Sequence, residues 1–117
     1  MKRKEFINIT LAVGFAAQML NACGSVVDPQ RINDILTLDG NPSQGAVLYA
    51  GQCQLCHGQD GSGGVIGPDI RQEVPLKTDQ ELLTLFIGGQ GNMLPIPLTD
   101  QQYADVLTYV RETFSGS

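Results

Sequence analysis

The chain has 117 residues, a length that suits one small domain. Acidic residues outnumber basic residues by 12 to 7, and the formal net charge is −5. This balance excludes the basic surface that a nucleic-acid-binding protein needs, so we expect no nucleic-acid partner.

The first 23 residues have the pattern of a bacterial lipoprotein signal. A basic start, Lys2-Arg3-Lys4, precedes an apolar stretch from Phe6 to Leu20 that is shorter than a membrane span normally needs. Leu20-Asn21-Ala22-Cys23 then resembles a lipobox, which predicts cleavage before Cys23 and lipid on its thiol. We expect an exported protein, lipid-anchored on the periplasmic side of a bacterial membrane. The alternatives are a plain cleaved signal peptide and an uncleaved anchor helix, in which Cys23 has no role.

These signals divide the chain into a signal peptide (1–22), a lipid-anchored tether (23–40) and a domain (41–117). Loss of residues 1–22 would leave 95 residues with 4 basic and 11 acidic side chains, a net charge of −7. Such a protein repels anionic lipid headgroups, so lipid rather than a basic patch must hold it at the membrane. The acid charge either steers it to a basic partner or serves solubility alone. Residues 32–38 are apolar enough to form a short helix or an extended arm on the domain.

Three helices and no convincing strand are expected in the domain, so the predicted fold class is all-α. Their ends are marked by N-cap residues, capping boxes and glycines. In chain order they run from Asn41-Pro42 to Cys53, from Thr78-Asp79-Gln80-Glu81 to Gly88-Gly89, and from Thr99-Asp100-Gln101-Gln102 along an apolar stripe of Tyr103, Val106, Leu107, Val110 and Phe114.

The most specific motif is Cys53-Gln54-Leu55-Cys56-His57, which has the C-x-x-C-H spacing typical of c-type haem attachment. Two thiols three residues apart can each form a thioether bond with a haem vinyl group, and His57 can then bind the iron. A thioredoxin-like redox pair would need a strand–helix context, and a zinc site would need four ligands. A disulfide between Cys53 and Cys56 is the simplest alternative, but the export signal and the adjacent His57 favour haem.

Met93 is the candidate for the second iron ligand. His57 is the only histidine, and Met93 is the only methionine beyond residue 19. Met93 follows the Gly-rich turn 88–92, where the backbone can approach a flat ligand closely. Ligation by one histidine and one methionine is typical of electron-transfer haem, and methionine raises the reduction potential. The alternative is that Met93 is an ordinary core residue.

The segment 58–67 contains five glycines without a phosphate-binding pattern. Ile66 stands where the last glycine of G-x-G-x-x-G would be, and no Gly-Lys-Ser/Thr follows. We therefore expect a loop that wraps closely round a haem edge.

Taken in this order, the motifs resemble a class I monohaem cytochrome c from about Asn41 to Phe114. The resemblance implies a small fold of about three main helices round one covalently bound haem c, with the first and last helices in close contact at Gly45. It also implies that the carbonyl of Pro68, in Gly67-Pro68, accepts a hydrogen bond from the second nitrogen of His57. The family often has proline directly after the methionine, whereas Leu94 follows Met93 here.

The resemblance further implies an electron carrier and not an enzyme. Such a protein would pass single electrons between a periplasmic or membrane dehydrogenase and an acceptor such as an oxidase or another cytochrome. A haem subunit of a multi-subunit oxidoreductase and a haem-based gas sensor are the alternatives. We expect water to be excluded by a low-polarity pocket made of Leu76, Leu82, Phe86, Ile87, Leu94 and Leu107.

Overall fold

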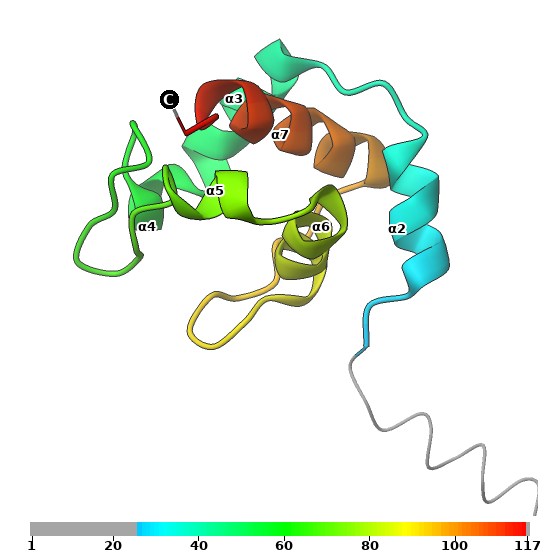
Figure 1. The fold of residues 1–117 in the computed structure, drawn as a ribbon, viewed down its shortest axis with the longest axis horizontal. Helices are drawn as coiled ribbons and strands as arrows, with labels where there is room; N and C mark the ends of the chain where they lie inside the picture. Colours follow the sequence, from blue (N-terminus) through cyan, green and yellow to red (C-terminus); the bar gives the residue numbers. More distant parts are fainter. Residues whose placement is uncertain (1–25, 117) are drawn as a thin grey trace, which may run out of the picture.

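A computed structural model describes residues 26–116, and this part of the chain is helical (Figure 1). No strand occurs within that range, where the single β-bridge joins Gln90 and Met93 in a tight turn. The predicted all-α fold class is confirmed. The six helices of this part are α2 (Pro29–Leu36), α3 (Pro42–Gln52), α4 (Gln54–His57), α5 (Glu73–Leu76), α6 (Asp79–Gly88) and α7 (Asp100–Thr113).

The three main helices expected from the sequence are α3, α6 and α7, and local side-chain caps set where they begin. The side chain of Asn41 accepts two backbone N–H groups of the first turn of α3, and Pro42 occupies the first helical position. The other two helices each begin with a reciprocal capping box, formed by Thr78 with Glu81 and by Thr99 with Gln102.

The domain is closed by the crossing of α3 and α7, which lie together at the top of Figure 1. A Cβ atom at Gly45 would lie 2.1 Å from the carbonyl oxygen of Asp105 and 2.6 Å from the Cβ of Tyr109. Only glycine permits so close an approach, as the resemblance implied. Because α3 ends at the Cys53 motif, this crossing also sets the position of the motif relative to α7.

The same crossing contains one buried carboxylate, Asp105, which is 6% exposed. It accepts hydrogen bonds from the backbone N–H of Asn41 and from the side-chain amide of Gln101, both at 2.9 Å. The Gln101 amide also donates to the carbonyl of Asp39 at 2.8 Å. A buried carboxylate is tolerated when its acceptors are satisfied in this way, and these bonds fasten the start of α3 to α7.

The core is built mainly on α7, whose predicted apolar stripe is buried along its whole length. Tyr49 of α3 packs beneath it, and α6 adds its own buried side chains. The buried members from these three helices include Tyr49, Leu82, Leu83, Phe86, Tyr103, Val106, Leu107, Val110 and Phe114.

The expected low-polarity pocket is only partly correct. Its members on α6 and α7 are buried or partly buried, but Leu76 is 79% exposed and Leu94 is 77% exposed. Leu76 follows the buried Val74 by two positions in α5, and residues two apart do not share a helix face. Leu94 lies next to the half-buried Met93 in the irregular segment between α6 and α7, and its side chain is exposed to solvent.

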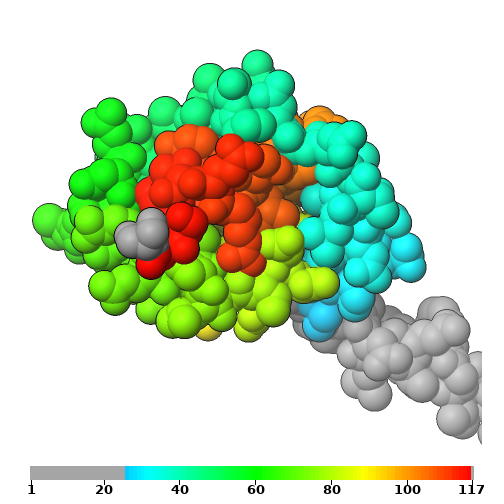
Figure 2. Space-filling view, turned by 45° about the horizontal axis from the view of Figure 1, so that its top comes forward, coloured from blue at the N-terminus to red at the C-terminus, as the bar shows by residue number. Residues whose placement is uncertain are grey.

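The described part of the expected tether contains a packed helix, α2. The side chain of Asp28 caps it by accepting from the backbone N–H of Gln30 at 3.0 Å. Ile32 and Ile35, one turn apart, are buried, and α2 contacts both α6 and α7 (Figure 2). Of the helix and the extended arm considered for residues 32–38, the structure therefore shows the helix, which packs on the domain and ends at Leu36.

Arg111 joins the last turn of α7 to α5 and α6. Its Nε donates to the carboxylate of Asp79 at 2.6 Å, and its terminal nitrogens donate to the carbonyls of Val74, at 2.7 Å, and of Lys77. A planar guanidinium can satisfy three acceptors at once, so one side chain holds the end of α5 and the start of α6.

The predicted signal peptide 1–22 and the predicted lipid site Cys23 lie outside the described residues. Between residues 26 and 116, the helices are too short or too polar to cross a membrane. The lipid anchor stays a prediction from the sequence.

The crossing at Gly45 predicts the effect of two alanine substitutions within α3. Gly45→Ala should lower the free energy of unfolding by about 1–3 kcal/mol, because the added methyl group overlaps the backbone of α7. Gly51→Ala is the matched control, since a Cβ there meets no atom within 4 Å. It should raise the free energy of unfolding by about 0.5–1 kcal/mol because alanine is the better helix former. Urea unfolding followed by circular dichroism measures both, and equal effects would contradict the close crossing.

Candidate functional site

The C-x-x-C-H motif lies on a helical turn that continues directly from α3. The N–H of Cys53 donates to the carbonyl of Tyr49 at 2.9 Å, and the N–H of His57 donates to the carbonyl of Cys53 at 3.0 Å. Residues three and four apart share a helix face, so Cys53, Cys56 and His57 belong to one face of this turn. Gly58 then ends α4 with a φ of 85°, a backbone conformation that favours glycine.

The imidazole of His57 is held by the segment that contains Pro68. Its Nδ1 lies 2.9 Å from the carbonyl oxygen of Pro68, the partner that the resemblance implies. A carbonyl can only accept, so this contact selects the tautomer in which Nδ1 carries the proton. The other ring nitrogen, Nε2, then keeps its lone pair for a metal ion.

The Gly-rich segment 58–67 wraps round α4 through its backbone. A Cβ at Gly67 would lie 2.7 Å from the carbonyl oxygen of Cys56 and 3.0 Å from Nδ1 of His57. The N–H of Gly67 donates to that carbonyl at 3.1 Å, and the N–H of Gly63 donates to the carbonyl of His57 at 2.7 Å. Glycine at position 67 therefore lets the Pro68 carbonyl come within hydrogen-bond distance of the imidazole.

Tyr49 ties the motif back to α3, a role that the sequence did not predict. Its hydroxyl donates to the carbonyl of Gly58 at 2.7 Å, and its ring packs against Tyr109 and Phe114 with centroids 5.5 and 5.6 Å away. Burial, and then the charge of Cys53, raises the pKa of Tyr49 to about 12, so the hydroxyl remains a donor. The available signal was its position four residues before Cys53, on the same helix face.

The environment of Cys53 does not favour a reactive thiolate. Cys53 and Cys56 are free thiols, and Cys53 is only 9% exposed. Burial, and then the charge of Cys56, raises the pKa of Cys53 to about 11. Reactive C-x-x-C pairs instead have a cysteine of lowered pKa. Cys53 therefore lacks the lowered pKa of an activated thiol.

The zinc alternative finds no support in the part of the chain that the structure describes. No group of three or more His, Cys, Asp or Glu side chains lies close enough together there to hold a metal ion. Structural zinc needs four such ligands.

Met93 lies in a tight turn between α6 and α7. Gln90 and Met93 exchange two backbone hydrogen bonds of 2.9 Å, and Gly89 and Gly91 have φ values of 71° and 58°. A Cβ at Gly89 would lie 2.5 Å from the carbonyl oxygen of Met93, so the turn folds closely back on its own start. The side chain of Met93 is half-buried and packs against the core, whereas Leu94 is exposed.

The donors on these two segments fit a covalently bound haem. Figure 1 shows α4 and the loop after α6 on the same side of the α3–α7 pair. Together the two segments supply two thiols on one helix face, an imidazole with a free Nε2 and a core-facing thioether. These are the groups that c-type haem requires of a protein. Because the backbone approaches closely at Gly67, the Pro68 carbonyl can fix the orientation of the His57 imidazole.

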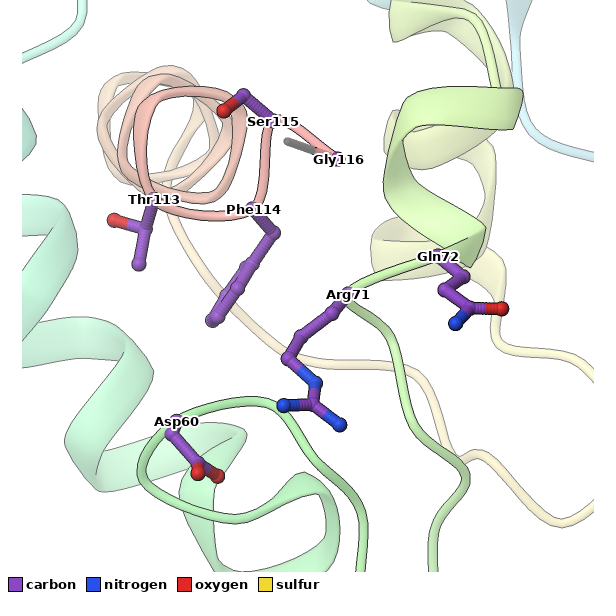
Figure 3. Close-up of a pocket in the computed structure, with 7 residues that line it drawn as sticks. All are labelled: Asp60, Arg71, Gln72, Thr113, Phe114, Ser115 and Gly116. Carbon is purple, nitrogen blue, oxygen red and sulfur yellow. The ribbon is translucent and has the colours of Figure 1, made fainter.

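A surface pocket elsewhere contains none of these donors (Figure 3). Its one cationic side chain, Arg71, is paired with Asp69 through bonds of 3.1 and 2.7 Å. These bonds lower the pKa of Asp69 to about 2 and leave the guanidinium occupied. The pocket therefore offers little to an anionic ligand. It is lined by Asp60, Arg71, Gln72, Thr113, Phe114, Ser115 and Gly116.

Comparison with known proteins points to the same chemistry. Residues 40–110 match the family model described as cytochrome c oxidase, cbb3-type, subunit III. A cytochrome c-553-like protein of Synechocystis sp. is 25% identical over 81 residues, which are 68% of this chain and 76% of that protein. The crystal structure of cytochrome cL from Hyphomicrobium denitrificans matches with a TM-score of 0.52 and 28% identity. That match covers 59% of this chain and 45% of cytochrome cL.

The helical fold and its C-x-x-C-H turn are those of a small class I c-type cytochrome, which carries one covalent haem c. The chain belongs to the family described as cytochrome c oxidase, cbb3-type, subunit III, and so to the electron-carrying cytochromes c. The resemblance, the fold class and the cofactor predicted from the sequence are confirmed. The individual roles of Cys53, Cys56, His57, Pro68 and Met93 remain predictions.

Proposed function

We propose that this cytochrome is a non-catalytic carrier of single electrons, with haem attached at Cys53 and Cys56 and iron bound by His57 and Met93. When bound, haem c supplies an iron that takes up and releases one electron. The observation that best supports the proposal is the 2.9 Å contact between Nδ1 of His57 and the carbonyl of Pro68. It keeps Nε2 available as an electron-pair donor with a fixed orientation. A permanently bound iron ligand requires both properties.

The remaining residues have complementary roles. Cys53 and Cys56 hold the group in place through two bonds to one helix face, which suits a domain too small to enclose it well. Met93 supplies a soft thioether, which raises the reduction potential. The paired hydrogen bonds of its turn keep the Met93 backbone fixed, so electron exchange needs little rearrangement.

Replacing Met93 tests this assignment directly. Ferric wild-type protein should show the weak far-red charge-transfer band of an iron–sulfur bond. Met93→Ala should abolish the band, lower the reduction potential and let the ferrous iron bind carbon monoxide, because no other methionine or histidine in 24–117 can replace the thioether. Absorption spectra and a redox titration measure these changes.

Leu94→Ala is the matched control for this substitution, since Leu94 is the exposed neighbour in the same loop. It should keep the band and the potential. If wild-type ferrous protein binds carbon monoxide rapidly and lacks the band, Met93 is a core residue and the gas-sensor alternative replaces the carrier.

The family description favours one alternative to a free carrier. Because the matching family is described as a subunit of an oxidase, the chain could serve as the haem subunit of a multi-subunit oxidoreductase. The same residues would then hold haem and transfer electrons to a catalytic chain that stays permanently bound. A catalytic chain that co-purifies in a fixed ratio distinguishes the subunit from the free carrier.

We further propose that Cys23 carries the lipid that holds the protein on the periplasmic side of the membrane. The support is the sequence Leu20-Asn21-Ala22-Cys23 after a signal-like apolar stretch. Cys23→Ser should release the cytochrome from membranes or leave it unprocessed, and should abolish labelling with fatty acid. Ser25→Ala is the control that keeps the motif. An intact mass that shows an unmodified Cys23 thiol would refute the anchor.

The segments that carry the proposed ligands are residues 53–68 and 89–98, which we call the rim, and Asp60 is their one charged residue. The stretches 40–59, 61–68 and 82–99 contain no Asp, Glu, Lys or Arg. The rim nevertheless exposes four large apolar side chains, Leu55, Val65, Ile66 and Leu94. Clusters of exposed apolar side chains mark interaction surfaces. We infer that the redox partner contacts this rim with an uncharged, apolar surface of its own.

An electrode can stand in for the unidentified partner. Wild-type protein should exchange electrons faster with a methyl-terminated monolayer on gold than with an amine-terminated one. Leu55→Asp combined with Leu94→Asp should slow exchange at the methyl surface, because two charges must then be desolvated. Val47→Asp, at an exposed position on α3 outside the rim, is the control and should change little. Faster exchange at the amine surface would favour a basic partner drawn by the acidic charge.

A further inference from the structure

We propose that α2 is a clamp that holds both ends of the Met93 loop (residues 89–98) and so keeps Met93 in place. This inference rests on the proposed role of Met93 as an iron ligand. The helix lies before residues 40–110, so the matched family model does not account for it.

The first contact of the clamp is made where the loop begins. A Cβ at Gly88 would lie 2.9 Å from Cγ2 of Val27, so the Val27 side chain lies directly on the last residue of α6. Val27 itself packs against the core and precedes Asp28, which caps α2. The loop leaves α6 at the next residue, Gly89, so the residue just before the N-cap of α2 covers its starting point.

The second contact is made where the loop returns. The guanidinium of Arg31 lies over the ring of Tyr103, 5.5 Å from its centroid, and is held there by Asp100 at 2.9 Å. The hydroxyl of Tyr103 donates to the carbonyl of Ile96 and accepts from the N–H of Leu98 at 3.4 Å. Arg31 therefore packs on Tyr103, whose hydroxyl binds the returning limb of the loop at Ile96, three residues after Met93.

The two contacts act on one connected unit. The N–H of Ile96 donates to the carbonyl of Phe86 at 2.9 Å, which joins the returning limb to the last turn of α6. Ile32 and Ile35 are buried on the inner face of α2, which packs against α6 and α7. Undocking α2 would uncover Gly88 and Tyr103 together. Because segments with fewer packed contacts open more easily, we expect Met93 then to leave its position more often.

The test undocks α2 in the haem-loaded protein while the ligand loop stays unchanged. Ile32→Ala with Ile35→Ala removes the buried face, and Asn33→Ala with Asp34→Ala is the matched control on the exposed face of the same helix. The far-red band of the ferric protein and the helical circular dichroism are followed during heating, and carbon monoxide binding is timed in the ferrous protein.

The clamp predicts that the undocked variant loses the far-red band at a lower temperature than it loses helicity. It should also bind carbon monoxide roughly tenfold faster or more, while the control behaves like wild type. Tyr103→Phe removes only the hydroxyl that binds Ile96 and should show a smaller change in the same direction.

Two results would overturn the inference in distinguishable ways. If the band and the helicity of each variant disappear together at one lowered temperature, α2 contributes only to global stability and the clamp is refuted. If wild-type protein lacks the band, or Met93→Ala leaves it unchanged, the ligand role of Met93 fails first and the clamp fails with it.

Discussion

The close crossing of α3 and α7 at Gly45 is the contact on which the rest of the structure depends. It brings the backbone of Asp105 within the space that a methyl group would occupy and buries the stripe of α7 against Tyr49. The haem-attachment turn continues the backbone of α3, and Tyr49 adds a side-chain hydrogen bond to the carbonyl of Gly58. The site therefore continues directly from the closely packed α3–α7 pair.

The two proposed iron ligands, His57 and Met93, are held in position by different contacts. His57 is oriented by a backbone carbonyl, which can approach only because residue 67 has no side chain. Met93 sits in a short turn that is closed by its own hydrogen bonds and, as we infer, secured at both ends by α2. Fixing both ligands in advance limits the rearrangement that accompanies a change of charge, which is what an electron carrier requires. Because Asp60 is the one charged residue of the rim, we propose that recognition there depends mainly on apolar contact.

Much of this arrangement was predictable because its causes are local in sequence. Asn41, Thr78 and Thr99 cap their helices through bonds to residues two or three positions away, and the C-x-x-C-H turn needs no distant partner. Contacts between distant segments were not predictable in the same way. The packing of α2, the reach of Arg111 to Asp79 and the outward turn of Leu94 depend on which segments meet in space. The short apolar pair Ile32 and Ile35 could indicate helix or arm until its neighbours were known.

The iron coordination itself gives the most direct test of this account. X-ray absorption at the iron edge of the purified protein, in both oxidation states, reports the atoms bound to iron without any substitution. A single sulfur neighbour should accompany the nitrogens in the ferric and the ferrous protein alike, since Met93 should stay bound in both. A coordination shell without sulfur in either state would contradict the assignment of Met93 and, with it, the carrier function.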